Sequence, residues 1–202
     1  WGITHLALSH FHLDHLGDLP ALLFAWRHGR LPAREAPLVV LGPTGTTALL
    51  DRWAAALGDW LRVPGFPLEV VEVPLETPVP LGDDVTLTAR AVPHTDESVA
   101  YCVAHAGRRL VYTGDTGPDE SLGAWAAGCD LLLAECSLPD TMALPIHLTP
   151  VTCAALAAAA APGRLVVTHM YPPLEGTDLR AAIGAHWAGE IVVAHDGLRL
   201  AC

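Results

Sequence analysis

Apolar residues fall in short runs bounded by turn-forming residues, and longer segments with helical spacing lie between several of these runs. Short runs rich in Val and Leu predict buried β-strands. Together with the intervening helices, they predict an α/β protein in which helices cover buried sheets. The predicted strands are residues 3–9, 37–41, 68–73, 85–92, 99–104, 109–113, 130–134, 165–168 and 190–194.

Five helices are predicted from spacing and capping residues: 18–28, 46–57, a short one after Asp119, one from Thr149 to the Pro162-Gly163 stop, and 178–187. Thr149 and Thr177 are the expected N-caps of the last two helices, because their hydroxyls can accept from first-turn amides. The segment 63–80 holds five prolines and predicts an edge strand with connecting loops. No linker demands a boundary, so a single domain over residues 1–202 is expected.

Composition excludes several classes of protein. The 202 residues are 51% hydrophobic and 16% charged, which is enough apolar material for a core and excludes disorder as the main state. Eleven basic residues, all Arg, against 22 acidic ones give a net charge of −11, the wrong sign for a nonspecific binder of nucleic acid or anionic membrane. No apolar run is long enough to cross a bilayer.

The five cysteines are an odd number and form no CxxC pair. This pattern suggests neither a disulfide framework nor a thiolate zinc site. A reducing, cytoplasmic location fits best.

One hexapeptide near the start concentrates metal-capable side chains directly after a predicted strand. Its residues are His10, Phe11, His12, Leu13, Asp14 and His15. From this composition, the spacing is expected by chance roughly 0.002 times in the chain. The alternative interpretation is a polar helix entry. In extended backbone His10 and His12 point the same way, while Asp14 and His15 sit where the chain turns toward a helix, so one pair can serve one metal and the next pair another.

Three further ligand-type residues follow the ends of predicted strands, where loops on a rigid scaffold commonly build sites. These are His94, Asp115 and His169. Taken singly, the two histidines could be ordinary loop residues and Asp115 a turn residue. Taken together, their placement favours a shared site.

With these motifs, the sequence resembles the metallo-β-lactamase fold superfamily, and within it the ribonuclease Z-like branch, over essentially the whole chain. The HxHxDH pattern matches residues 10–15, the third family histidine matches His94, the bridging aspartate matches Asp115 and the last histidine matches His169. The resemblance implies a four-layer αββα sandwich. It also implies two divalent metal ions, zinc or alternatively manganese, one held by His10, His12 and His94, the other by Asp14, His15 and His169, with Asp115 bridging.

The same resemblance implies a catalytic set of Asp14, His147 and Glu135, with a metal-bridging hydroxide as nucleophile. His147, held by Glu135, would deliver a proton to the leaving oxygen. Without the resemblance, His147 could equally cap the following helix, and Glu135 could pair with an arginine.

Two departures from the family pattern limit the functional prediction. The family has several strands before its HxHxDH loop, so the domain is expected to be N-terminally incomplete and to lack the first strands. Members that process transfer RNA carry a basic arm, which would lie between Tyr101 and Tyr112, where only ten residues intervene. An extended RNA partner is therefore not expected.

The sequence favours an arm-less hydrolase acting on a small or short phosphodiester, with no membrane partner. One alternative keeps the metals but changes the substrate to a lactam, lactone, thioester or sulfate ester. Another is a catalytically idle metal-binding fragment. A homodimer is a further possibility, because a first strand with an unpaired edge invites pairing.

Overall fold

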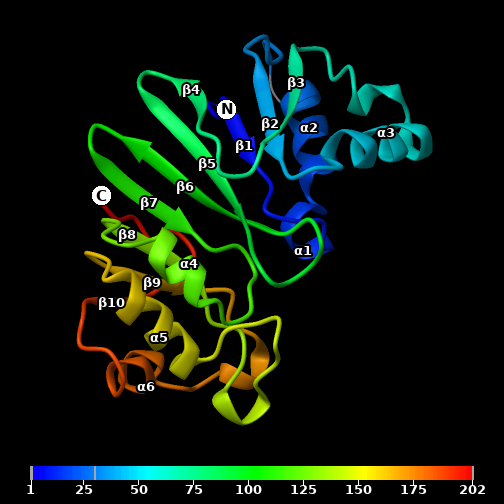
Figure 1. Cartoon of the computed structure of the whole chain (residues 1–202). Helices are drawn as coiled ribbons and strands as arrows, with labels where there is room; N and C mark the ends of the chain where they lie inside the picture. Colours follow the sequence, from blue (N-terminus) through cyan, green and yellow to red (C-terminus); the bar gives the residue numbers. More distant parts are fainter. Residues whose placement is uncertain (1, 30, 202) are drawn as a thin grey trace. The chain divides into compact units, whose positions relative to one another are not determined.

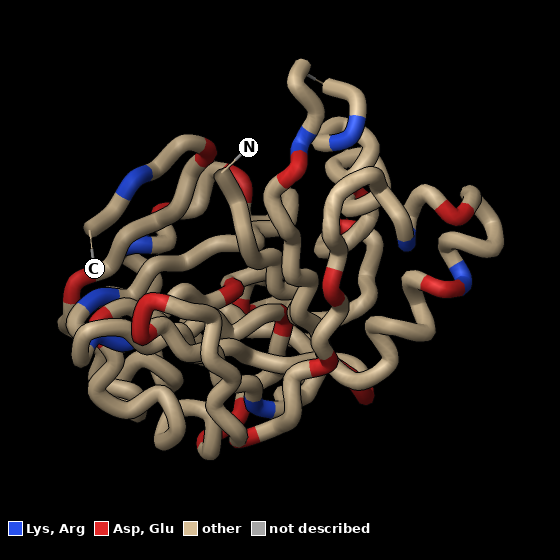
Figure 2. Tube along the Cα trace, turned by 90° about the horizontal axis from the view of Figure 1, so that it is seen from above, with Lys and Arg blue, Asp and Glu red and all other residues tan. Residues whose placement is uncertain are grey.

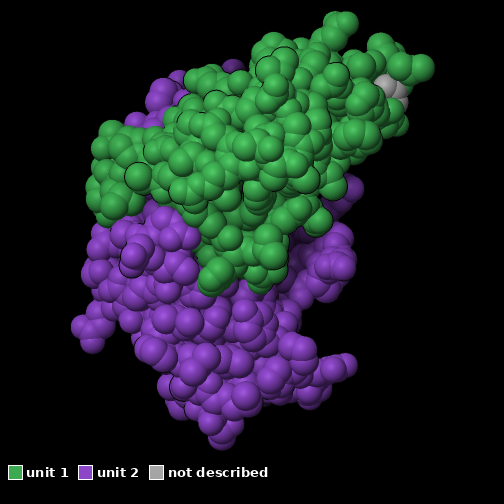
Figure 3. Space-filling view, turned by 90° about the vertical axis from the view of Figure 1, so that its right-hand side faces the viewer, with its two compact units in different colours: residues 1–77 green, residues 78–202 purple. Residues whose placement is uncertain are grey.

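The computed structural model describes residues 2–29 and 31–201, which divide into two compact units, 1–77 and 78–202 (Figure 3). Each unit contains one β-sheet with helices (Figure 1). The expectation of a single domain stays a prediction. Within the described residues, no helix is long and apolar enough to cross a membrane.

Unit 1 is built on a parallel sheet ordered β1 (His5–Ala7), β2 (Leu38–Gly42) and β3 (Leu68–Glu72). Its helices are α1 (Leu13–Leu16), α2 (Leu19–His28) and α3 (Thr46–Leu57), followed by the 3₁₀ turn η1 (Asp59–Leu61). Leucines from strand and helix meet in one core, which includes the fully buried Leu23, Leu38, Leu50 and Leu61. Leu8, which follows β1 just before the histidine-rich turn, is buried in the same core.

Unit 2 is built on a seven-stranded sheet with the order β10-β9-β8-β7-β6-β5-β4. Strands β4 to β7 pair antiparallel, and β7 to β10 pair parallel. The strands are β4 (Val79–Gly82), β5 (Val85–Ala91), β6 (Val99–His105), β7 (Arg108–Tyr112), β8 (Leu131–Glu135), β9 (Leu165–Thr168) and β10 (Ile191–Val193). The helices are α4 (Glu120–Trp125), α5 (Pro150–Ala160) and α6 (Leu179–Gly184), with 3₁₀ turns η2 (Asp140–Met142) and η3 (Pro172–Leu174).

The strand directions in unit 2 bring four loops to one edge of the sheet. Strands β7, β8 and β9 run parallel, so their carboxyl ends lie at the same edge. Strand β5 runs antiparallel to β6, which runs antiparallel to β7, so β5 also ends there. Loops at the carboxyl ends of parallel strands are a common place for ligand sites in α/β proteins.

All nine predicted strands form, with boundaries that differ by at most two residues from the predicted ones. Strand β4 was not among them. It lies at the edge of its sheet, and an edge strand tolerates Pro80, which has no backbone N–H to donate. The five predicted helices also form, but the expected cap Thr177 is wrong. Asp178 caps α6 instead, accepting from the amide of Ala181, because a carboxylate one residue later reaches the first turn.

Strands β6 and β7 form a tight hairpin. Tyr101 pairs with Tyr112 and His105 with Arg108, so only Ala106 and Gly107 make the turn. Both have positive φ, 49° and 78°, as two-residue hairpin turns require. No arm extends between these strands.

Candidate metal centre

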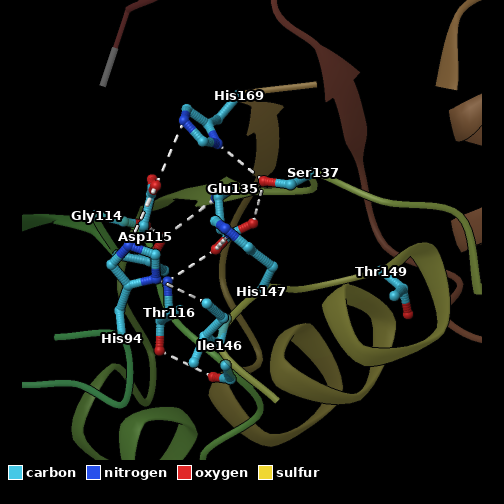
Figure 4. Close-up of polar contacts among 12 residues, drawn as sticks. His94, Gly114, Asp115, Thr116, Glu135, Ser137, Ile146, His147, Thr149 and His169 are labelled. Atoms are coloured by element: carbon cyan, nitrogen blue, oxygen red, sulfur yellow. Dashed lines mark hydrogen bonds and ion pairs between the residues drawn. The ribbon is translucent and has the colours of Figure 1, made fainter. Parts of the chain in front are cut away.

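The four loops at the carboxyl edge of the unit 2 sheet carry the predicted site residues of that unit. His94 follows β5, Asp115 follows β7, Glu135 ends β8 and His169 follows β9. His147 comes from the segment that leads into α5, where Thr149 accepts from the amide of Thr152 and caps the helix as predicted. Side chains from five separated stretches therefore meet at one place (Figure 4).

The Asp115 carboxylate lies at the centre of this group. Its Oδ2 is 3.8 Å from Nε2 of His94 and 3.4 Å from Nε2 of His169. One ligand atom from each of Asp115, His147 and His169 lies within 4.8 Å of the others. Asp115 is 2% exposed, so its charge is largely removed from water. A buried carboxylate that faces two imidazole nitrogens suits a divalent cation.

The Glu135 carboxylate contacts His147 directly and His169 through Ser137. Its Oε1 accepts from Nδ1 of His147 at 2.9 Å and from the backbone amide of Thr116 at 2.8 Å. Its Oε2 accepts from the hydroxyl of Ser137. Three donors thus saturate a carboxylate that is 1% exposed, as a buried charge requires. The alternative partner for Glu135, an arginine, is excluded by these contacts.

The hydrogen bonds determine which ring nitrogen of each histidine carries the proton. Nδ1 of His94 lies 2.9 Å from the carbonyl of Ile146, which can only accept, so Nδ1 is the donor. Nδ1 of His147 donates to Glu135 for the same reason.

His169 follows the same rule through Ser137. The single hydroxyl proton of Ser137 is given to Glu135, so its oxygen accepts from Nδ1 of His169 at 2.8 Å. In their neutral forms all three imidazoles therefore present an Nε2 lone pair, which is the form that binds metal. The donor set of unit 2 fits a divalent ion.

The backbone of His169 is held in an unusual conformation. Its φ is 58°, in the left-handed region that non-glycine residues rarely adopt. Such residues cluster at functional sites, where the surrounding structure maintains the strain. Here the Ser137 contact and the burial of β9 hold the ring in place.

Two buried cysteines lie next to Glu135 but are not ligands of this site. The Cys153 thiol donates to the backbone carbonyl of Glu135 at 2.9 Å. Its hydrogen bond with Cys136, together with burial, raises the pKa of Cys153 well above the ordinary thiol value. Only the thiolate binds metal well, so the Cys153 thiol remains a core residue, and Cys136 is fully buried beside it. The four described cysteines are all free, as predicted, and Cys202 lies outside the described residues.

Unit 1 carries the other predicted donors on the turn between β1 and α2. Nε2 of His10 lies 3.2 Å from Nδ1 of His12, and the His10 and His15 rings are 4.2 Å apart. Nε2 of His15 lies 3.6 Å from Oδ2 of Asp14. His10 is fully buried, whereas Asp14 and His12 are exposed. All four predicted donors of this unit therefore lie together, which favours the metal-binding interpretation of the hexapeptide over a polar helix entry.

Two residues that contact the predicted site residues were missed from the sequence. Ser137 connects Glu135 to His169, and its position two residues after Glu135 at a strand end is a signal that could have found it. Tyr171 packs its ring 5.0 Å from that of His169 and 5.5 Å from that of His147. Its proximity in sequence to His169 was the available signal.

Comparison with known proteins identifies a family. The sequence family described as the beta-lactamase superfamily domain matches residues 2–170 of this chain. An uncharacterized protein of Mycobacterium leprae is 31% identical over 195 residues, covering 94% of this chain and 67% of that protein. A ribonuclease Z of Mycobacterium bovis is 29% identical over 224 residues, covering 96% of this chain and 78% of that protein.

Solved structures show the same fold. The metallo-beta-lactamase fold protein YhfI from Bacillus subtilis matches with a TM-score of 0.81 at 21% identity, covering 96% of this chain and 75% of that chain. Zn²⁺-bound PqqB from Methylobacterium extorquens matches with a TM-score of 0.72 at 21% identity, covering 99% of this chain and 73% of that chain. These matches confirm the predicted α/β metallo-β-lactamase fold with two sheets flanked by helices.

Proposed function

Because the chain belongs to the beta-lactamase superfamily and is a metal-dependent hydrolase by fold and donor set, we propose that it cleaves a small or short phosphodiester. One observation carries the proposal. His147 is held by Glu135 and lies beside Asp115 and His169, where it can serve a leaving oxygen. The 29% identity to a ribonuclease Z supports phosphodiester rather than other ester chemistry.

We propose that the predicted donors of both units serve one pair of divalent ions. His10, His12 and His94 would hold one ion, Asp14, His15 and His169 the other, and Asp115 would be shared. Zinc is favoured, because imidazole and carboxylate donors suit it and a protein of the same fold, PqqB, is Zn²⁺-bound, with manganese as the alternative. When bound, two such ions lower the pKa of a water molecule and polarise the phosphoryl group.

The protein itself contributes a proton donor, His147, whose ring is held in position. Nδ1 of His147 donates to Glu135, so its Nε2 is the nitrogen left to exchange a proton with substrate. The buried carboxylate stabilises the imidazolium that forms when Nε2 is protonated. Proton delivery of this kind helps most when the leaving oxygen is a poor leaving group, such as an alkoxide.

Charge and loop length favour a small substrate. Acidic positions outnumber basic ones along the chain (Figure 2). The loops 93–98, 113–118, 135–149 and 168–178 contain no Arg or Lys at all. The β6–β7 hairpin turns within two residues, so no arm projects from it, and its exposed Arg108 is paired with Asp130. Binding of an extended polyanion needs several phosphate contacts from cations, which these loops do not supply.

The test is turnover by the purified chain, loaded separately with zinc and manganese, against bis(p-nitrophenyl) phosphate. A lactam, a lactone, a thioester and a sulfate ester serve as competing substrates. We expect metal-dependent cleavage of the diester above all others. The His147→Ala variant should lose more activity on a diester with an alkyl leaving group than on the nitrophenyl ester.

Metal content is measured on the same samples. Two bound ions with no diester cleavage would contradict the proposal, and a higher melting temperature without turnover would indicate an idle metal-binding fragment. Faster cleavage of another ester class would move the assignment to that class.

A further inference from the structure

An open apolar hollow lies in unit 2 directly after His169. Its volume is about 400 Å³. It is lined mainly by Met170, Tyr171, Pro172, Leu174 and Val193, and Glu175 is also among its lining residues. The lining comes from the segment after β9, from the first residue of α6 and from strand β10, which pairs with β9. The hollow is therefore formed entirely within one unit.

Tyr171 separates this hollow from the histidines. Its ring contacts those of His169 and His147, with centroids 5.0 and 5.5 Å away, and also lines the hollow. The Tyr171 amide donates to the carbonyl of Ser137 at 3.1 Å, so its backbone is fixed to the same network that orients His169. A group bound in the hollow would thus lie next to the proposed site of cleavage.

The chemistry of the walls selects what could bind. No Arg or Lys lines the hollow, and Glu175 repels a phosphate, so the charged part of the substrate belongs outside it. Met, Tyr, Leu and Val side chains favour an apolar or aromatic group. A cavity of about 150 Å³ is enough to hold benzene, so a hollow of this size admits a single substituted ring.

From this placement we infer that the hollow binds an uncharged aromatic substituent of the phosphodiester, on the ester oxygen that is not cleaved. The inference rests on the proposed function. It makes Met170 and Tyr171 specificity-determining residues, which neither hold metal nor transfer a proton. An aromatic diester would then be preferred over an alkyl aryl diester with the same leaving group.

Two substrates with a common leaving group test this: bis(p-nitrophenyl) phosphate and methyl p-nitrophenyl phosphate. Two variants change the hollow at different positions of its lining. Met170→Ser removes apolar contact, and Thr177→Trp adds a ring at another lining residue, which is not adjacent to His169 in the sequence. Met142→Ser is the matched control, because Met142 is the other methionine of the chain, is 51% exposed, and does not line the hollow.

We expect the ratio of kcat/KM for the aryl over the methyl diester to fall about fivefold in Met170→Ser and Thr177→Trp, since about one to two methylene equivalents of contact are lost or blocked. Metal content should stay at the wild-type level, and the methyl diester, which places no ring in the hollow, is the internal reference for the ratio. Met142→Ser should leave the ratio unchanged.

Unchanged ratios in both variants, with both esters still cleaved, would overturn this inference and leave the proposed function intact. A metal-loaded wild type that cleaves neither ester would overturn the proposed function and this inference with it. A change in molecular mass in solution on Met170→Ser would show instead that the hollow contacts a second copy of the chain.

Discussion

The two units present their metal-capable side chains in different ways. In unit 2 the donors come from segments far apart in the sequence and are oriented by a buried carboxylate and a serine. In unit 1 four donors lie within six residues, and the contacts described among them run from one donor to the next. One set is arranged by tertiary structure and the other by sequence adjacency. The comparison teaches that hydrogen bonds already fix the imidazole tautomers of unit 2. This unit is therefore the better prepared of the two to bind metal.

The largest difference should appear between Asp115→Asn and Asp14→Asn, a matched pair with one member in each unit. Asp115 is buried and faces two imidazoles, whereas Asp14 is exposed. Because Asp115 is the proposed shared ligand, its loss should lower the affinity for both proposed ions, by more than the roughly 100-fold seen for supporting residues. Asp14→Asn should release only one ion. Metal analysis after dialysis measures this, and full metal content in Asp115→Asn would break the comparison.

A smaller effect is expected for Glu135→Gln. The amide keeps one acceptor oxygen but presents its NH₂ group toward donors from Ser137 or His147. We expect metal affinity and kcat to fall about 10- to 100-fold, and the unfolding free energy to fall by about 1–3 kcal/mol.

Glu190→Gln is the control for that variant. Glu190 is exposed and pairs with Arg164 at the surface, so the change should alter neither quantity measurably. Calorimetric titration with zinc measures the metal affinity of both variants, and thermal melts measure their stability. Equal losses in the two would mean that Glu135 has no special role in organising the donors.

The smallest effect is expected at the opposite edge of the unit 2 sheet. Hydrogen bonds from the Arg109 amide and the Arg108 side chain lower the pKa of Asp130 below its ordinary value. A depressed folded-state pKa adds stability above the unfolded value, near 4, and that stability is lost as the pH falls through the folded value. Asp130→Asn should therefore lower the melting temperature slightly at pH 7, and the gap should narrow below about pH 4. A change in activity or metal content would contradict our expectation that Asp130, directly before β8, does not affect the metal site at the other end of the strands.

Local signals in the sequence predicted most of the fold. The Val- and Leu-rich runs become strands, and the Thr149-Pro150 start of α5 forms as expected, because buried strands and capped helices depend on residues near in the chain. The edge strand β4 was missed because Pro80 and a loop mask its pattern. The cap of α6 is Asp178 rather than Thr177, because the carboxylate one residue later accepts from the amide of Ala181.

The candidate site was predictable where donors are adjacent or follow strand ends, as with the hexapeptide and His94. The contact of Ser137 with His169 spans 32 residues and depends on strands β8 and β9 lying side by side, which no local pattern specifies. The position of Tyr171 against two histidines is of the same kind. The resemblance implied the ligands and the pair of Glu135 and His147, but it did not point to Ser137 or Tyr171.

The two-residue turn at Ala106 and Gly107 has a consequence for engineering and for divergence within the family. Strand pairing on both sides continues up to His105 and Arg108, so residues added between these positions would project from the hairpin tip without shifting the register of Tyr101 against Tyr112. Loop lengthening at such a tip costs only about 0.6 kcal/mol for each doubling. The hairpin is thus a natural graft point, at which a recognition element for a larger substrate could be added to this scaffold without rebuilding the sheet.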